Sequence, residues 1–172
     1  MGVWHIAGLG KSPRAVTVPL TCIYLLLKAA KKNEKARKFF ELSGKETAEK
    51  KGEPEGIVLF TSEEIAQGEL SELDIEITDI WFSTKGKILP KIIQRYISKL
   101  LEYLFGDEDI SMPELYFVKV DPFNFDDCFP IIYATINAFG FGSGKELWGN
   151  VVAGTNQINA SILISGTYSG AI

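Results

Sequence analysis

Residues 3–13 have the sequence Val-Trp-His-Ile-Ala-Gly-Leu-Gly-Lys-Ser-Pro. The apolar run from Val3 to Ala7 predicts a short strand, and the two glycines after it predict a tight turn with accessible backbone N–H groups. An apolar, helix-like run follows Pro13. Because a helix N-terminus attracts anions, this order of strand, glycine turn and helix predicts an α/β fold with a site for phosphate.

A second glycine loop stands toward the other end of the sequence. Gly154-Thr155-Asn156-Gln157 follows a predicted strand at 147–153 and leads into a predicted helix at 157–168. Its backbone donors, one hydroxyl and two carboxamides suit phosphate oxygens, ribose oxygens or base edges. Capping of the helix by Thr155 or Asn156 is the structural alternative.

Strands and helices alternate between these two loops. Further strands are predicted at 57–60, 75–82 and 115–120, and further helices at 17–31, 89–105 and 126–139. The apolar residues of 89–105 recur at spacings of three and four, as on one helix face. Pro19 is expected in the first turn of its helix, where proline is tolerated. This alternation predicts an α/β, Rossmann-like fold: a mainly parallel central sheet with helices on both faces.

In such a sheet, ligands bind beyond the carboxyl ends of the strands, at the point where the strand order reverses. Every loop that follows a strand shares that edge. Lys11 would supply a point charge for phosphate and Ser12 a hydroxyl donor. The candidate ligand-binding residues are Gly10, Lys11, Ser12, Ser83, Thr84, Lys85, Gly154, Thr155, Asn156 and Gln157.

The first glycine loop matches neither of two common phosphate-binding motifs. It lacks the upstream glycine that a Walker A motif separates from Gly-Lys-Ser by four residues. It also differs from the dinucleotide fingerprint, because Pro13 stands where the third glycine or alanine should be. A turn with a purely structural role is therefore an alternative for this loop.

Composition favours a single globular domain. The 172 residues are 46% hydrophobic and 23% charged, with a formal net charge of −4, which is enough for a sizeable core but argues against a nonspecific nucleic-acid coat. The longest apolar stretch, 16–27, is too short to span a bilayer, and no secretory signal is predicted. We expect a cytoplasmic protein without membrane contact, in which Cys22 and Cys128 are buried free thiols.

The sequence offers little for metal or cofactor chemistry. His5 is the single histidine and there is no Cys-x-x-Cys pair. The acidic residues at 107–109 and 126–127 lie in loop or helix-start sequence, where capping explains them. No metal and no cofactor are predicted. Trp4, Trp81 and Trp148 fall within predicted strands and are expected to pack in the core.

Two stretches together resemble a known family. They are the strand that runs into Ala-Gly-Leu-Gly-Lys-Ser-Pro at 7–13 and the strand that runs into Val-Val-Ala-Gly-Thr-Asn-Gln at 151–157, before an apolar helix. The chain resembles the CRISPR-associated Rossmann-fold (CARF) sensor domains, in particular the Csx1 and Csm6 group of type III CRISPR accessory proteins. The resemblance implies a single ligand-sensing domain over 1–172 that acts in antiviral defence.

In that family the domain forms a two-fold homodimer, and a cyclic oligoadenylate lies across the dimer axis. The resemblance implies that Gly10, Lys11 and Ser12 form the binding surface together with 154–157, each loop acting twice. Many relatives carry a lysine in the late loop, where this sequence has Asn156 and Gln157. Lys11 is expected to supply the positive charge instead.

The family's effector is usually a following ribonuclease domain, which carries an arginine and a histidine four to six residues later. Arg14, Arg37 and Arg95 have no histidine after them. The expected function is therefore a sensor that regulates an effector ribonuclease outside this chain, as a fragment of a longer protein or as a stand-alone domain. Direct DNA binding is not expected, because no helix-turn-helix segment follows the sensor sequence.

Three alternatives stay open at this stage. The chain could be a metal-independent ring nuclease that cleaves cyclic oligoadenylate with the help of Ser12 and Lys11. It could be another nucleotide-binding enzyme on a Rossmann-like sheet. It could also be an interaction domain in which both glycine loops are only structural.

Overall fold

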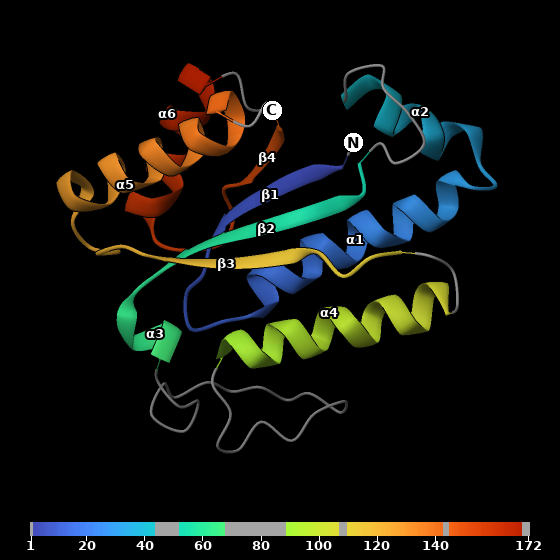
Figure 1. Cartoon of the computed structure of the whole chain (residues 1–172), viewed down its shortest axis with the longest axis horizontal. Coiled ribbons are helices and arrows are strands. Elements are labelled where there is room, and N and C mark those ends of the chain that lie inside the picture. Colours follow the sequence, from blue (N-terminus) through green and yellow to red (C-terminus); the bar gives the residue numbers. More distant parts are fainter. Residues whose placement is uncertain (1, 44–51, 68–88, 107–109, 143–144, 170–172) are drawn as a thin grey trace.

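The fold is described from a computed structural model (Figure 1). The structure describes residues 2–43, 52–67, 89–106, 110–142 and 145–169. The predicted strand at 75–82, with Trp81, and the candidate residues Ser83, Thr84 and Lys85 lie outside the described residues.

The described helices and strands alternate along the chain. In order they are β1 (Val3–Gly8), α1 (Arg14–Ala30), α2 (Glu34–Ser43), β2 (Pro54–Thr61), α3 (Glu63–Gln67), α4 (Leu89–Phe105), β3 (Glu114–Lys119), α5 (Phe125–Asn137), the short π-helix η1 (Ala138–Gly142), β4 (Glu146–Asn150) and α6 (Asn156–Ser169). The bounds of α4 are those that its apolar spacing predicts. The helix α2 was not predicted as a separate element.

The four described strands form one parallel sheet in the order β3-β2-β1-β4. β1 is an inner strand, with Ile6 opposite Val58 of β2 and opposite Gly149 of β4. A parallel crossover needs a long connection, which here contains helices, as the alternation of elements predicts. The predicted α/β, Rossmann-like fold is confirmed.

Helices cover both faces of this sheet, so most strand positions are apolar. Figure 1 shows α1 and α4 on one face and α5 and α6 on the other. Ala7 and Leu59 belong to the core beneath α1 and α4. Ile6 and Val58 belong to the core beneath α5 and α6. Trp4 also packs in this second core, with 2% of its surface exposed.

Pro19 lies in the second turn of α1, and its predicted position in the first turn is wrong because α1 begins at Arg14. Proline lacks the N–H that would bond the carbonyl oxygen four residues earlier, on Ala15. The Asn150 carboxamide replaces it: Nδ2 donates to the Ala15 carbonyl oxygen over 3.2 Å. The helix therefore continues through Pro19 with the help of a side chain from β4.

The last strand is shorter than predicted and ends at Asn150 rather than at Ala153. The Val152 N–H donates to Oδ1 of Asn150 over 2.9 Å, and such a side-chain turn takes the backbone out of the sheet. The apolar residues Val151 and Val152 then lie in the loop, 42% and 80% exposed.

The two cysteines differ in burial. Cys128 is buried, as expected, but Cys22 is exposed, so its predicted burial is wrong. The buried face of α1 includes Leu20 and Tyr24. Cys22 stands midway between these two positions, about 200° around the helix from each, and therefore faces away from the sheet.

His5 lies on β1, on the face that α1 covers, among aromatic rings. The centroids of His5 and Trp148 are 5.5 Å apart in an edge-to-face arrangement, and Trp148 stacks on Phe40 at 6.3 Å. The Nε2 atom of His5 is buried without a hydrogen-bond partner among the described residues. Burial lowers the pKa of His5 from 6.5 to about 4, because the charged imidazolium would lose its hydration.

We expect the free energy of unfolding to fall as the pH drops from 6.5 toward 4. In this window the unfolded chain binds a proton that folded His5 excludes, which costs about 1.4 kcal/mol per pH unit. Since His5 is the single histidine, His5→Phe should lack this component, whereas carboxylate titration is common to both proteins. Urea unfolding of both at several pH values checks this. Equal pH slopes for the two proteins would contradict it.

Candidate functional site

The candidate site lies at the carboxyl edge of the sheet, between β1 and β4. In the order β3-β2-β1-β4 the direction of strand addition reverses there, and ligands of open α/β sheets bind at such a reversal. The loop 9–13 follows β1 and the loop 151–155 follows β4. These are the two glycine loops of the sequence analysis.

Gly8 and Gly154 bring the two loops into backbone contact. A Cβ on either glycine would lie 2.8 Å from the Cα of the other. Gly154 also has φ of +93°, a conformation that side chains other than glycine rarely adopt. The chain can therefore make this close approach only where both residues lack a side chain.

Gly10, by contrast, faces open space. A Cβ built on it would meet no atom within 4 Å. The two residues after it, Lys11 and Ser12, are exposed. No ion-pair partner of Lys11 occurs among the residues that the structure describes. The β1 loop thus presents an accessible backbone and an available cation beside the packed glycine pair.

The β4 loop presents a different chemistry. Asn156 is exposed and Gln157 is half-buried, both in the first turn of α6. The Thr155 hydroxyl donates to the Pro122 carbonyl oxygen over 2.6 Å and accepts the Ile158 N–H at 3.5 Å. Thr155 therefore caps α6 and holds the loop after β3, whereas the two carboxamides remain at the surface.

Side-chain to backbone hydrogen bonds tie the loops of this edge together. Besides the Thr155 bond, the buried Thr61 hydroxyl donates to the Leu9 carbonyl oxygen over 2.8 Å, and Asn150 holds Ala15 as described above. Sequence patterns do not indicate that Thr61 and Asn150 organise these loops. A partial signal exists for Asn150, because Pro19 leaves the Ala15 carbonyl without its helical partner.

The edge is electrically divided. α1 begins at Arg14, after the β1 loop that carries Lys11, and α6 begins at Asn156, directly after the β4 loop, so both helices have the positive ends of their dipoles at this edge. α1 has no side-chain cap. Near the end of β3, by contrast, Lys119 is paired with Glu63, and Asp121 and 126–127 add negative charge. The part of the edge that suits an anion is therefore the part around β1 and β4.

The structure places no metal site here. Among the described residues there is no group of three His, Cys, Asp or Glu side chains that could hold a metal ion. Likewise, no helix in the described ranges is long and apolar enough to cross a membrane.

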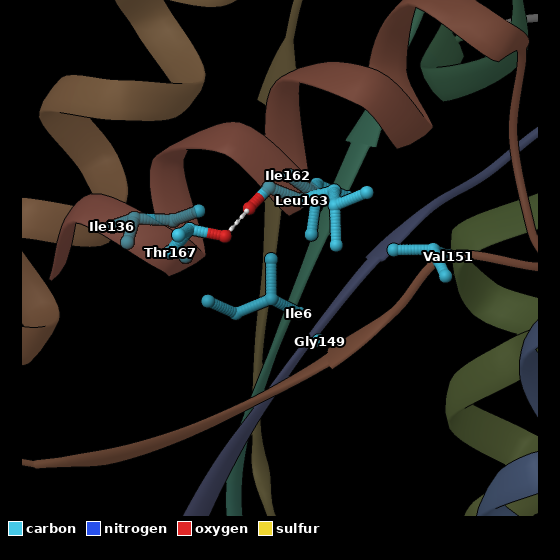
Figure 2. Close-up of a pocket in the computed structure, with 8 residues that line it drawn as sticks. Ile6, Ile136, Gly149, Val151, Ile162, Leu163 and Thr167 are labelled. Atoms are coloured by element: carbon cyan, nitrogen blue, oxygen red, sulfur yellow. Dashed lines mark hydrogen bonds between the residues drawn. The ribbon is translucent and has the colours of Figure 1, made fainter. Parts of the chain in front are cut away.

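A surface without charges adjoins the site. Residues 147–172 contain no Asp, Glu, Lys, Arg or His, and β4 is at one edge of the sheet that the described strands form. Several large apolar side chains of this segment are exposed: Val151 42%, Val152 80%, Leu163 60%, Ile164 38% and Tyr168 75%. Beneath α6 a cavity of about 90 Å³ opens among them (Figure 2), lined by Ile6, Ile136, Gly149, Val151, Ile162, Leu163, Gly166 and Thr167.

Known proteins supply three comparisons. No family model matches the chain. It is 40% identical to an uncharacterized protein of Archaeoglobus fulgidus over an alignment 185 residues long, gaps included, which covers 100% of this chain and 55% of that protein. The chain thus spans about half the length of this relative.

Among solved structures, the fold is similar to Enterococcus italicus Csm6 bound to cyclic hexa-2'-fluoro-hexa-dAMP, with a TM-score of 0.50 and 14% sequence identity. The similarity covers 98% of this chain and 31% of that chain. At this identity the likeness shows a shared fold.

The glycine contact predicts unequal effects of three alanine substitutions. Gly154→Ala and Gly8→Ala should each lower the free energy of unfolding by about 1–3 kcal/mol, because the new Cβ clashes with backbone and, at Gly154, φ is positive. Gly10→Ala should change it by less than about 0.5 kcal/mol. Urea unfolding of the three variants measures this. Similar losses at all three positions would contradict the described contact.

Proposed function

We propose that this chain is a CRISPR-associated sensor domain that binds a cyclic oligoadenylate at the β1–β4 edge of its sheet. The observation that carries the proposal is the contact of the two glycine loops at the strand-order reversal, with the open backbone of Gly10 and the exposed Lys11 beside it. The likeness of the fold to Csm6 supports a cyclic oligonucleotide as the ligand class.

The edge offers a place for each part of a nucleotide. Phosphate oxygens would accept hydrogen bonds from the β1 loop and from the uncapped start of α1, and Lys11 would offset one negative charge. The exposed Asn156 and the half-buried Gln157 can bond ribose or base atoms. A net charge of −4 does not oppose this binding, since the cation and the helix N-termini are local to the site.

We propose further that two copies of the chain associate through the surface formed by the charge-free residues 147–152 and α6. Each copy carries a net charge of −4, so two copies repel least where a wide apolar face has no charge of its own. This face adjoins the glycine loops, and a two-fold axis through it would bring both sites to one ring. Ring binding would then favour one relative position of the two copies. This change would regulate an effector ribonuclease; in the Archaeoglobus relative, the part that this chain does not cover is long enough for a further domain.

Lys11→Ala should lower the affinity for the ring at least about 100-fold, since a dimer loses two charge-assisted contacts of about 1.5–3 kcal/mol each. Lys28→Ala is the matched control, because Lys28 is an exposed lysine in the last turn of α1, away from the site. Calorimetry with cyclic tetra-adenylate and cyclic hexa-adenylate, with linear oligoadenylate and NAD for comparison, measures affinity and stoichiometry.

One ring bound per two chains is the expected stoichiometry. If the folded wild type bound neither ring, the proposed function would be wrong. It would also be wrong if Lys11→Ala bound the ring as tightly as Lys28→Ala and the wild type. Analysis of the same mixtures for linear products tests ring cleavage.

Leu163→Lys should convert the dimer to a monomer, because the proposed interface would bury the new lysine, as an unpaired charge, against the second copy of the chain. Leu25→Lys is the matched control: Leu25 is 49% exposed on α1, in the opposite helical layer. Sedimentation velocity of the two variants and the wild type measures the change. A wild type that is monomeric with and without the ring, or a Leu163→Lys variant that remains dimeric, would contradict the proposed interface.

A further inference from the structure

A second set of exposed side chains adjoins the site and consists of aromatic rings. Phe123, in the loop between β3 and α5, is 80% exposed, and Phe125 and Tyr133 are 37% and 41% exposed. The core face of α5 is made by other residues, including Cys128 and Ile132. The packing of α5 against the sheet therefore does not explain why these aromatic side chains are exposed.

Phe125 and Tyr133 form a stacked column with the half-buried Phe129, along a flank of α5 beside its core face. Phe125 and Phe129 lie 5.3 Å apart between centroids with 15° between their planes. Phe129 and Tyr133 lie 5.8 Å apart with 26° between their planes. The column begins at the carboxyl edge of the sheet, where α5 starts, and α5 lies beside α6 on the same face (Figure 1).

The loop that carries Phe123 is fixed against the candidate site. The Pro122 carbonyl oxygen accepts the hydroxyl of Thr155, the residue after Gly154, over 2.6 Å. The Phe123 N–H donates to Oδ1 of Asp121 over 3.0 Å. Phe123 therefore directly follows the residue that is hydrogen-bonded to the β4 glycine loop, and its ring is exposed to solvent.

The charges around this aromatic surface indicate what it can bind. No Lys, Arg or His occurs from 120 to 144, whereas Asp121, Asp126 and Asp127 do. A phosphate would be repelled there. A base is a flat, uncharged ring, and bases stack on exposed aromatic side chains whatever their sequence. The carboxylates can in addition accept hydrogen bonds from an exocyclic amino group such as that of adenine.

We infer that Phe123, two residues before the column formed by Phe125, Phe129 and Tyr133, is a stacking platform for a base of the nucleotide ligand. The inference rests on the proposed function and deepens it. The phosphates lie at the Lys11 side of the edge and the base at the Phe123 side, so the division of charge along the edge fixes the orientation of each nucleotide.

The test compares Phe123→Ala, Phe123→Trp and the wild type in calorimetry with cyclic hexa-adenylate and with cyclic hexa-uridylate. Phe123→Ala should weaken binding of the adenine ring at least about 10-fold and reduce the preference for adenine over uracil, because purines stack more strongly. Phe123→Trp should retain both. Tyr103→Ala is the matched control, since Tyr103 is 73% exposed on α4, in the opposite layer.

Salt dependence separates stacking from phosphate contact. Phe123→Ala should leave the slope of log affinity against log salt unchanged, whereas Lys11→Ala should reduce it. A wild type that binds the adenine ring as tightly as its Phe123→Ala variant would overturn the platform and leave the proposed function standing. A dimer weakened by Phe123→Ala, with ring affinity unchanged, would also overturn it in favour of a protein contact. A wild type that binds neither ring overturns both proposals.

Discussion

The backbone contact between Gly8 and Gly154 is the constraint on which the carboxyl edge of the sheet depends. Because neither residue has a side chain, the end of β1 and the loop after β4 touch directly. This contact sets how closely the loop after β4 can lie beside the end of β1, in the loops that lead into α1 and α6. The hydrogen bonds from Thr61 and Asn150 then hold the neighbouring loops in position.

Around this contact the protein carries three surfaces of different chemistry. A cationic part contains Lys11 and two helix N-termini, an aromatic and acidic part contains Phe123, and an uncharged apolar part consists of 147–152 and α6. In the proposed assembly these would bind phosphate, base and a second copy of the chain. The three functions differ in salt dependence and in stoichiometry, so their contributions are separable by measurement.

Much of the fold could be predicted from local sequence, because apolar spacing and glycine turns act over a few residues. α4 is found by its spacing, and the two glycine loops are found by their position after apolar strands. Asn150 could not be found in this way, since its bond to Ala15 joins segments that are far apart in the chain. The same bond allows Pro19 to lie in the second turn of α1, although proline is expected in the first turn of a helix. α2 was missed although Asn33, whose Oδ1 accepts the Lys35 N–H at 2.9 Å, marks its start.

The inner position of β1 has a consequence for how the protein is made. β1 pairs on one side with β4, the last of the described strands, with Val3 opposite Glu146. Contacts between residues so distant in sequence form slowly, because the entropy of closing a long loop is lost before the contact stabilises the chain. During synthesis, one side of β1 keeps its N–H and C=O groups open to strands of other chains until β4 has left the ribosome. The yield of folded protein in a cell should therefore depend on how well that edge is shielded during translation.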